Sequence, residues 1–354
     1  MMELKELRGK IDEIDSILLK KLNDRAKLSL EIGKIKSCGK KEIYAPAREK
    51  EVYLNLIKKN TGPMTEKSLC AIYREIMSAS IALEKTVRVA YLGPPASFTH
   101  LASLSKFGSS VEYLSCDNIP DVFREVEKSR ADYGVVPIEN STEGAVTYTL
   151  DMFVDANLKI CSEIMFEINH NLISNSPKNM IKKVYSNPQV FSQCRLWIEK
   201  NIPRAVLVDM TSTTKAAQKA KRSKYSAAIA SRLAAEMYGL KITAASIEDS
   251  PHNVTRFLVI GKNDVSYTGS DKTSIMFSVK DRVGALYNML APFKKNKINL
   301  TKIESRPSKK KAWKYYFFVD IEGHYDDKKV KTALKELAAH CHYVKILGSY
   351  PKSN

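Results

Sequence analysis

The chain has 354 residues, enough for two or three domains of ordinary size, and a formal net charge of +18. Such a positive charge is consistent with binding to a nucleic acid, with an anionic substrate, or with a solvated lysine-rich surface. The basic residues are not interleaved with aromatic residues, so no nucleic-acid partner is expected. No apolar run reaches the ~20 residues of a membrane span, and the N-terminus lacks the layout of a signal peptide, so we expect a cytoplasmic protein without membrane contact. The cysteines lack CxxC spacing, so no metal site is expected.

Residues 4–36 predict one long helix, because apolar side chains recur every three or four positions and no proline occurs before Pro46. Such a helix reaches ~50 Å, which is longer than a small domain can cover with its own chain. Part of its apolar stripe is therefore expected to pack on a second copy, which predicts a homodimer or a dimer of dimers. Helices that begin at Pro46 and after Thr65 complete an all-helical domain of residues 1–86.

Residues 87–264 predict an α/β domain, since short β-rich runs alternate there with helical stretches. The interval 174–245 has its own alternation, so we expect two lobes, with the chain returning to the first lobe before Thr255. Clefts between lobes commonly bind ligands. Neither GxGxxG nor GxxxxGK occurs, so no nucleotide cofactor is expected.

Residues 271–354 predict the element order βαββαβ of ferredoxin-like folds. Gly284 stands at the turn from the first strand into the first helix. This order alone indicates a fold and not a function, because such folds host many functions.

Four cations in the helical domain are available to one small polyanion. Arg25 and Lys36 are 11 residues apart (36 − 25), about three helical turns, so they project from one face. Arg8 lies about a quarter-turn off that face and would meet a site most easily in the partner subunit. Arg48 adds a fourth cation at the start of the second helix. The alternative interpretation is a set of solvated surface charges.

The spacing of these cations resembles that of the helical chorismate mutase family, which implies chorismate as a substrate. The resemblance implies that Arg25, Arg48 and the partner's Arg8 hold its two carboxylates, without any acid, base or cofactor. Lys36 would reach the ether oxygen, and Glu84 would have to be protonated to donate to it. The matching residues of the site are Arg8, Arg25, Lys36, Arg48, Glu49, Ser80 and Glu84, of which Glu49 would bind the substrate hydroxyl.

The triplet Thr255, Arg256 and Phe257 stands at the start of the apolar run 257–260, which is expected to be a buried strand. A buried hydroxyl and guanidinium need fixed polar partners, so the triplet indicates either a site for an anion or an exposed strand start. Together with polar loops around Asn140, Ser186 and Gln193, the triplet resembles the prephenate dehydratase family over residues 87–261.

This second resemblance implies a two-lobed α/β domain, similar to periplasmic binding proteins, that converts prephenate to phenylpyruvate. It implies that Thr255 donates a proton or hydrogen bond to the leaving hydroxyl, that Arg256 pairs with a carboxylate and that Phe257 packs near the ring. Asn140, Ser186 and Gln193 would support the bound substrate.

The C-terminal segment resembles the ACT domain, which in this family binds L-phenylalanine. The resemblance is carried by residues 304–307 and by the expected effector-binding residues Gly284, Ala285, Leu286, Asn299 and Leu300. All three resemblances together imply a bifunctional chorismate mutase and prephenate dehydratase under feedback control. The alternatives are a non-catalytic sensor of a small anion or amino acid, and a basic protein that binds nucleic acid.

Overall fold

The computed structural model describes residues 4–38, 44–279, 283–308 and 315–353. The chain divides into two compact units, which we call the helical unit (Met1–Arg88 with Lys106–Glu112) and the sheet unit (Val89–Ser105 with Tyr113–Asn354). Each is described by itself. Among the described residues, no helix combines the length and apolar character needed to cross a lipid bilayer.

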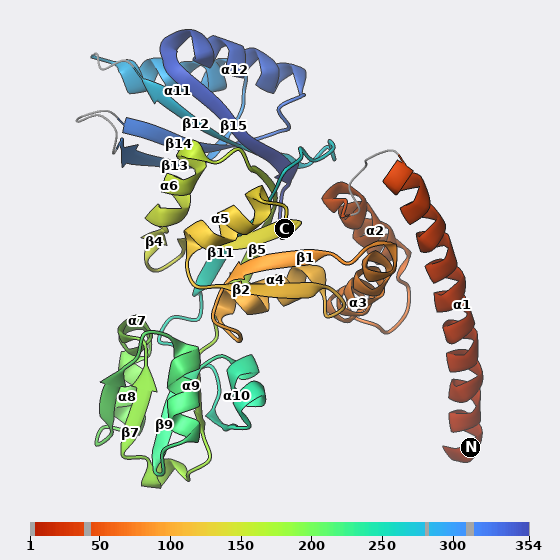
Figure 1. The fold of residues 1–354 in the computed structure, drawn as a ribbon, viewed down its shortest axis with the longest axis vertical. Helices are drawn as coiled ribbons and strands as arrows, with labels where there is room; N and C mark the ends of the chain where they lie inside the picture. The colour runs from red at the N-terminus through yellow and green to blue at the C-terminus, as the bar shows by residue number, and fades with distance from the viewer. Residues whose placement is uncertain (1–3, 39–43, 280–282, 309–314, 354) are drawn as a thin grey trace. The chain divides into compact units, whose positions relative to one another are not determined.

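Three helices build the helical unit (Figure 1): α1 (Leu4–Cys38), α2 (Pro46–Lys59) and α3 (Glu66–Glu84). They confirm the three predicted helices. Pro46 stands at the first position of α2, where a missing N–H costs nothing. Thr65 caps α3, because its side chain accepts a hydrogen bond from Ser68 N over 3.1 Å.

The two halves of α1 have different surroundings. In the second half Gly33 is buried, and a Cβ atom there would lie 3.1 Å from Cβ and Cγ of Glu84, so a larger residue would push α1 and α3 apart. Leu28, Leu30, Ile32 and Ile35 in the second half are nevertheless exposed. The large apolar side chains of the first half are exposed too, and α1 runs clear of α2 and α3 there (Figure 1). These exposed side chains are Leu4, Leu7, Ile11, Ile14, Ile17, Leu18, Leu19 and Leu22.

The first sheet of the sheet unit draws its strands from distant parts of the chain. They are β1 (Arg88–Leu92), β2 (Glu112–Cys116), β3 (Tyr133–Asn140), β4 (Gly144–Ala145), β5 (Lys159–Glu167) and β11 (Val254–Gly261), with helices α4 (Phe98–Phe107), α5 (Ile119–Glu127) and α6 (Thr147–Asp155). The strand order is β2-β1-β3-β11-β5, and β4 pairs with β3. Strand β11 is antiparallel to both β3 and β5. The chain thus leaves this sheet and returns to it, as predicted.

Residues 171–244 form a second sheet, which confirms the second predicted lobe. Its strands are β6 (Asn171–Ser174), β7 (Lys183–Ser186), β8 (Val206–Asp209), β9 (Ser226–Ala230) and β10 (Lys241–Ala244), and its helices are η1 (Lys178–Met180), α7 (Pro188–Gln193), α8 (Arg195–Asn201), α9 (Thr213–Lys221) and α10 (Arg232–Tyr238). The strand order is β10-β6-β9-β7-β8. Buried alanines of α9 pack with Ala228 and Ala230 of β9, and their small size allows helix and sheet to approach closely.

A third sheet completes the sheet unit. Its elements are β12 (Asp271–Val279), α11 (Ala285–Lys295), β13 (Leu300–Pro307), β14 (Tyr315–Glu322), α12 (Lys328–His340) and β15 (Cys341–Pro351). The strands lie in the order β13-β14-β12-β15. This arrangement confirms the predicted βαββαβ unit.

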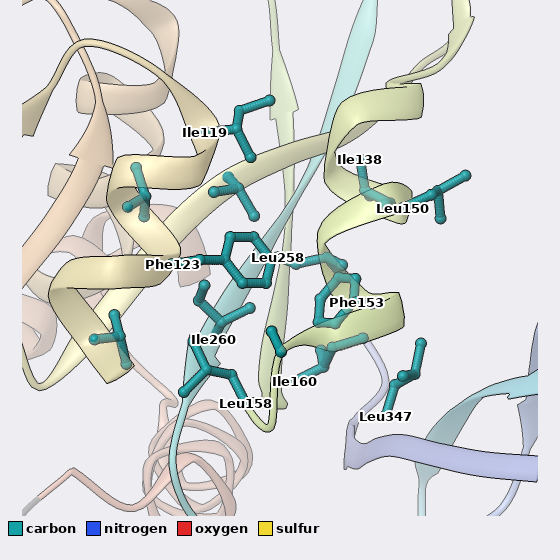
Figure 2. Packing of buried hydrophobic residues seen from close by; sticks show 14 of the residues in the cluster. Ile119, Phe123, Ile138, Leu150, Phe153, Leu158, Ile160, Leu258, Ile260 and Leu347 are labelled. Carbon is teal, nitrogen blue, oxygen red and sulfur yellow. The ribbon is translucent and has the colours of Figure 1, made fainter. Parts of the chain in front are cut away.

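One apolar cluster joins the first and third sheets (Figure 2). Phe123 of α5 and Phe153 of α6 meet edge to face with ring centroids 5.2 Å apart. Leu258 of β11 and Ile160 of β5 lie in the same cluster, and Leu347 of β15 enters it from the third sheet. The third sheet is therefore part of the core that supports β11.

Candidate active sites

A cavity of about 460 Å³ lies in the helical unit. Its walls come from α1, α2, α3 and two residues at the end of α4, Lys106 and Phe107, that fold with this unit. Six of the seven residues predicted to bind chorismate line it: Arg25, Lys36, Arg48, Glu49, Ser80 and Glu84.

Two contacts between α1 and α3 orient the polar groups of this first cavity. Arg25 Nη1 donates a hydrogen bond to Ser80 Oγ, which in turn donates to Ile76 O over 2.8 Å. Lys36 Nζ lies 3.1 Å from Glu84 Oε2, and the two side chains are only 22% and 7% exposed. Because water is largely excluded, this pair interacts more strongly than a surface ion pair. A cation and a carboxyl group thus stand side by side.

Glu49 is held by two groups that the sequence analysis did not identify. Tyr44 OH donates a hydrogen bond to Glu49 Oε2 over 3.0 Å, and Lys106 Nζ lies 2.9 Å from the same oxygen. Glu49 and Tyr44 are buried. No local pattern links Lys106 to Glu49, since 57 positions separate them (106 − 49).

Arg8 and Arg48 differ from the other predicted cations. Arg8 is exposed and does not line the cavity. On a straight helix Arg8 and Arg25 lie roughly 25 Å apart, so one chain cannot bring both to one small molecule. Arg48 lines the cavity, but its Nη1 atom pairs with Glu51 Oε2 at 2.6 Å on the exposed side of α2.

A second cavity, of about 540 Å³, lies in the sheet unit. Residues from β3, β11, α7 and the first turns of α4 and α9 line it. Four of the six residues predicted to bind prephenate are among them: Asn140, Gln193, Thr255 and Phe257.

Backbone donors fix the direction of the hydrogen bonds around Thr255. Asn140 Oδ1 accepts from Thr142 N over 2.9 Å and from Glu143 N over 3.1 Å. Asn140 Nδ2 is therefore the atom that donates to Thr255 Oγ1, over 2.8 Å. Since the Thr255 oxygen accepts this bond, its own hydrogen is left for another acceptor. Thr255 can thus donate a hydrogen bond to a ligand in the cavity.

Asn253 and His170 extend this arrangement, and the sequence analysis identified neither. Asn140 Nδ2 also donates to Asn253 Oδ1 over 2.8 Å, and Asn253 Nδ2 donates to Gln193 Oε1 over 3.1 Å. His170 Nε2 lies 2.9 Å from the same Gln193 oxygen, so Nε2 carries the hydrogen. Burial lowers the pKa of His170, which keeps the ring neutral. Gln193 is held in one orientation as a result.

Arg256 and Ser186 are not brought to the second cavity. Successive side chains of a strand point to opposite faces, so Thr255 and Phe257 of β11 share the face with the cavity and Arg256 points the other way. Ser186 is fully buried and donates to Ile229 O over 2.9 Å. The structure therefore does not bring to this cavity two residues of the predicted site: Arg256, expected to pair with a substrate carboxylate, and Ser186, expected to support the bound substrate.

Arg256 instead ties β11 to three other strands. Its Nε lies 2.8 Å from Glu163 Oε2 on β5, its Nη1 lies 2.6 Å from Asp320 Oδ2 on β14, and its Nη2 donates to Tyr350 OH on β15 over 3.0 Å. Burial alone would lower the pKa of Arg256, but Tyr350, Asp320 and Glu163 raise it above its ordinary value. The guanidinium therefore stays charged and serves the structure of the sheet unit.

The described residues that line the second cavity include no lysine or arginine. They do include Phe98 and Thr99 in the first turn of α4 and Thr213 at the start of α9. The first N–H groups of a helix have no acceptor within the helix and carry a partial positive charge. These groups can receive a carboxylate where no cation is present.

The residues predicted to bind the effector lie in two short segments, one at the start of α11 and one at the start of β13. Gly284 precedes α11 with a φ of 77°, a left-handed conformation that favours glycine. Ala285 and Leu286 follow in the first turn of α11, and Leu286 is exposed. Asn299 and Leu300 stand together at the start of β13, and Asn299 is exposed.

Three family models match the chain in the order of its parts. Residues 7–85 match chorismate mutase type II, residues 89–265 match prephenate dehydratase and residues 273–339 match the ACT domain.

Full-length relatives share this order. A bifunctional chorismate mutase/prephenate dehydratase of Aquifex aeolicus is 52% identical and is aligned over 100% of this chain and 99% of its own length. One of Stutzerimonas stutzeri is 42% identical over 99% of this chain and 98% of its own length. The solved prephenate dehydratase of Arthrobacter aurescens, in complex with L-Phe, is 33% identical with a TM-score of 0.71, covering 75% of this chain and 90% of that one. The chain belongs to the bifunctional chorismate mutase/prephenate dehydratase family.

Proposed function

We propose that the first cavity carries out the chorismate mutase reaction and the second the prephenate dehydratase reaction. The enzyme then converts chorismate through prephenate to phenylpyruvate, a step of phenylalanine biosynthesis. One observation carries this assignment: six residues predicted from the mutase family line one cavity, and four predicted from the dehydratase family line another.

The mutase reaction needs positioning more than acid or base chemistry, because one C–C bond forms and one C–O bond breaks within a single molecule. Arg25 and Arg48 hold the carboxylates of the folded substrate. Lys36 donates to the ether oxygen, where negative charge develops, and Glu84 donates to it when protonated. Glu49 accepts a hydrogen bond from the ring hydroxyl. Lys36 and Glu84 both line the first cavity with their polar atoms 3.1 Å apart, so both can reach the same substrate oxygen once Glu84 carries a proton.

The mutase site takes Arg8 from a partner subunit in a homodimer or a dimer of dimers. The exposed apolar stripe of α1 supports this proposal, because eight large apolar side chains in water are costly and a second α1 would cover them. The distance between Arg8 and Arg25 along α1 supports it as well. The location of the enzyme in the cytoplasm stays a prediction.

In the dehydratase reaction, the bond to the ring carboxylate breaks and its electrons enter the ring as the hydroxyl leaves. Thr255 donates a hydrogen bond to the departing hydroxyl, while Asn140 holds the threonine oxygen. Phe257 packs near the ring, and Gln193 holds the substrate from the other lobe. The substrate carboxylates bind at the first turns of α4 and α9, since the described lining offers no cation.

The third sheet, within a domain of residues 271–354, binds L-phenylalanine as the effector. The turn at Gly284, Ala285 and Leu286 can receive the charged ends of an amino acid, together with Asn299 and Leu300. The L-Phe complex of the Arthrobacter aurescens relative supports this assignment. Residues 1–86 and 87–264 form the mutase and dehydratase domains in this proposal.

Incubating the purified chain with chorismate, without any added cofactor, tests the proposed function. We expect prephenate to appear first and phenylpyruvate after it, as followed by their ultraviolet absorbance. Added L-phenylalanine should change the second rate, and Leu286→Asp should abolish that change. A chain that binds prephenate without converting it would instead be a sensor.

Mixing two inactive variants tests the shared mutase site. Arg8→Ala and Arg25→Ala should each lose mutase activity, because each removes a carboxylate partner. In coexpressed mixtures, roughly a quarter of the sites should regain both arginines, since a two-fold dimer pairs each site with the other chain's α1. Mixtures that recover no activity would show that Arg8 acts within its own chain or not at all.

A further inference from the structure

Lys106 and Phe107 build one wall of the first cavity, although they lie outside the residues that match the mutase family. The match ends at residue 85, 21 positions before Lys106 (106 − 85). Phe107 is buried, and its ring centroid lies 4.9 Å from that of Tyr44. The mutase family therefore gives these two residues no role.

Hydrogen bonds to α3 fix the segment that carries Lys106. Glu75 Oε2 accepts from Ser109 N over 2.9 Å and from Ser109 Oγ over 2.7 Å, and Ser78 Oγ accepts from Ser110 N over 3.1 Å. Gly108 has a φ of 72°, and a Cβ atom there would lie 2.6 Å from Ser78 Cβ. Only glycine satisfies both conditions. The segment is thus a built part of the helical unit.

Lys106 points its charge at the one carboxylate that the proposed mechanism uses as an acceptor. Its Nζ atom lies 2.9 Å from Glu49 Oε2, and the two side chains are 22% and 10% exposed. Tyr44 OH bonds to the same oxygen over 3.0 Å, and its ring centroid lies 5.9 Å from Nζ. Both of these contacts fall on Oε2, so Glu49 Oε1 can accept a hydrogen bond from the substrate hydroxyl.

We propose that Lys106 is a positioning residue of the mutase site, which holds Glu49 in place and neutralises it. This inference rests on the proposed assignment of the first cavity to chorismate. Chorismate carries two carboxylates, so a third carboxylate in the cavity repels it unless a cation lies beside that group. Without Lys106, Glu49 would also compete with the substrate for Arg25 and Lys36. The lysine therefore affects substrate binding more than the rearrangement itself.

Lys106→Met, which keeps the length of the side chain and removes its charge, tests this role. We expect mutase kcat/KM to fall roughly 10-fold or more, the effect of losing a charge-assisted hydrogen bond, with most of the change in KM. Lys106→Arg should restore most of the loss. Lys59→Met, on the exposed end of α2, is the matched control and should leave mutase kinetics unchanged.

A double-mutant cycle with Glu49→Gln separates positioning from folding. If Lys106 acts through Glu49, Lys106→Met should have little further effect in the Glu49→Gln background, and dehydratase kcat/KM with prephenate should stay near the wild-type value. Additive effects in the cycle, or a Lys106→Met enzyme with wild-type mutase KM, would overturn the proposal. A wild-type chain that does not convert chorismate would instead refute the proposed function.

Discussion

Arg256→Leu is expected to lower the free energy of unfolding of the sheet unit by about 3–5 kcal/mol, because it leaves buried carboxylates without their cation. Glu163 keeps a contact with Lys272 Nζ at 2.8 Å, but Asp320 loses its cation at 2.6 Å and keeps the hydrogen bond from Ser274 Oγ. Urea denaturation followed by fluorescence measures the change. Both β14 and β15 lose their tie to β11, so the third sheet should loosen first.

Arg195→Leu provides the control for this measurement. Arg195 Nε lies 2.8 Å from Glu199 Oε1, but the two side chains are 74% and 59% exposed. Its loss should leave the free energy of unfolding nearly unchanged, because water screens an exposed ion pair. Well below its unfolding temperature, Arg256→Leu should bind prephenate with a KM near that of the wild type. A large rise in that KM without loss of stability would return Arg256 to the substrate site.

Thr255→Val should remove most of the dehydratase activity and leave the mutase activity intact. Valine has nearly the shape of threonine but cannot donate to the leaving hydroxyl, and a donor placed at a reacting group contributes about 10²–10⁴-fold in rate. Asn140 Nδ2 would also lose one of its two acceptors, the Thr255 oxygen at 2.8 Å. Turnover of prephenate and of chorismate, measured separately on one preparation, checks the result.

Thr255→Ser distinguishes the hydroxyl group from the shape of the side chain. It restores the donor, so dehydratase kcat should recover to a large part of the wild-type value. If Thr255→Val keeps a wild-type kcat, the hydrogen bond from Thr255 plays no part in the departure of the hydroxyl. The proton would then have to come from another group in the second cavity.

The helices of the first unit could be predicted because their signals are local. The apolar period of α1, the proline at the start of α2 and the Thr65 cap depend only on near neighbours in the chain. The return of the chain as β11 could also be predicted, because an apolar run with β-rich composition follows the second lobe. The order of strands within each sheet could not, because pairing depends on contacts between distant segments.

Arg256 is the residue of the triplet 255–257 that the structure separates from the second cavity. Thr255, Arg256 and Phe257 are adjacent in sequence, and the sequence analysis assigns all three to one site. The period of two along a strand puts the middle residue on the opposite face, and this signal was available in the sequence. The partners of Arg256 were not, because Glu163 precedes it by 93 residues and Tyr350 follows it by 94.

Lys106, Asn253 and His170 were missed for a different reason. Each acts on a residue that is remote in sequence, and each looks like an ordinary polar residue in its own segment. Asn140 and Asn253, for example, are 113 residues apart and meet only because β3 and β11 are neighbours. Only the folded chain reveals such pairs.

Residues 106–112 fold with the helical unit, although they follow the first strand of the sheet unit. This affects whether one gene could be divided into a gene for the mutase and a gene for the dehydratase. A gene cut after residue 86 would encode a mutase without the wall formed by Lys106 and Phe107, and Tyr44, now only 3% exposed, would lose the ring that covers it. The remaining gene would encode a dehydratase whose Lys106 has no Glu49. The dehydratase is expected to work without that contact, whereas the mutase would need new mutations to restore its wall, so the fusion is easier to keep than to undo.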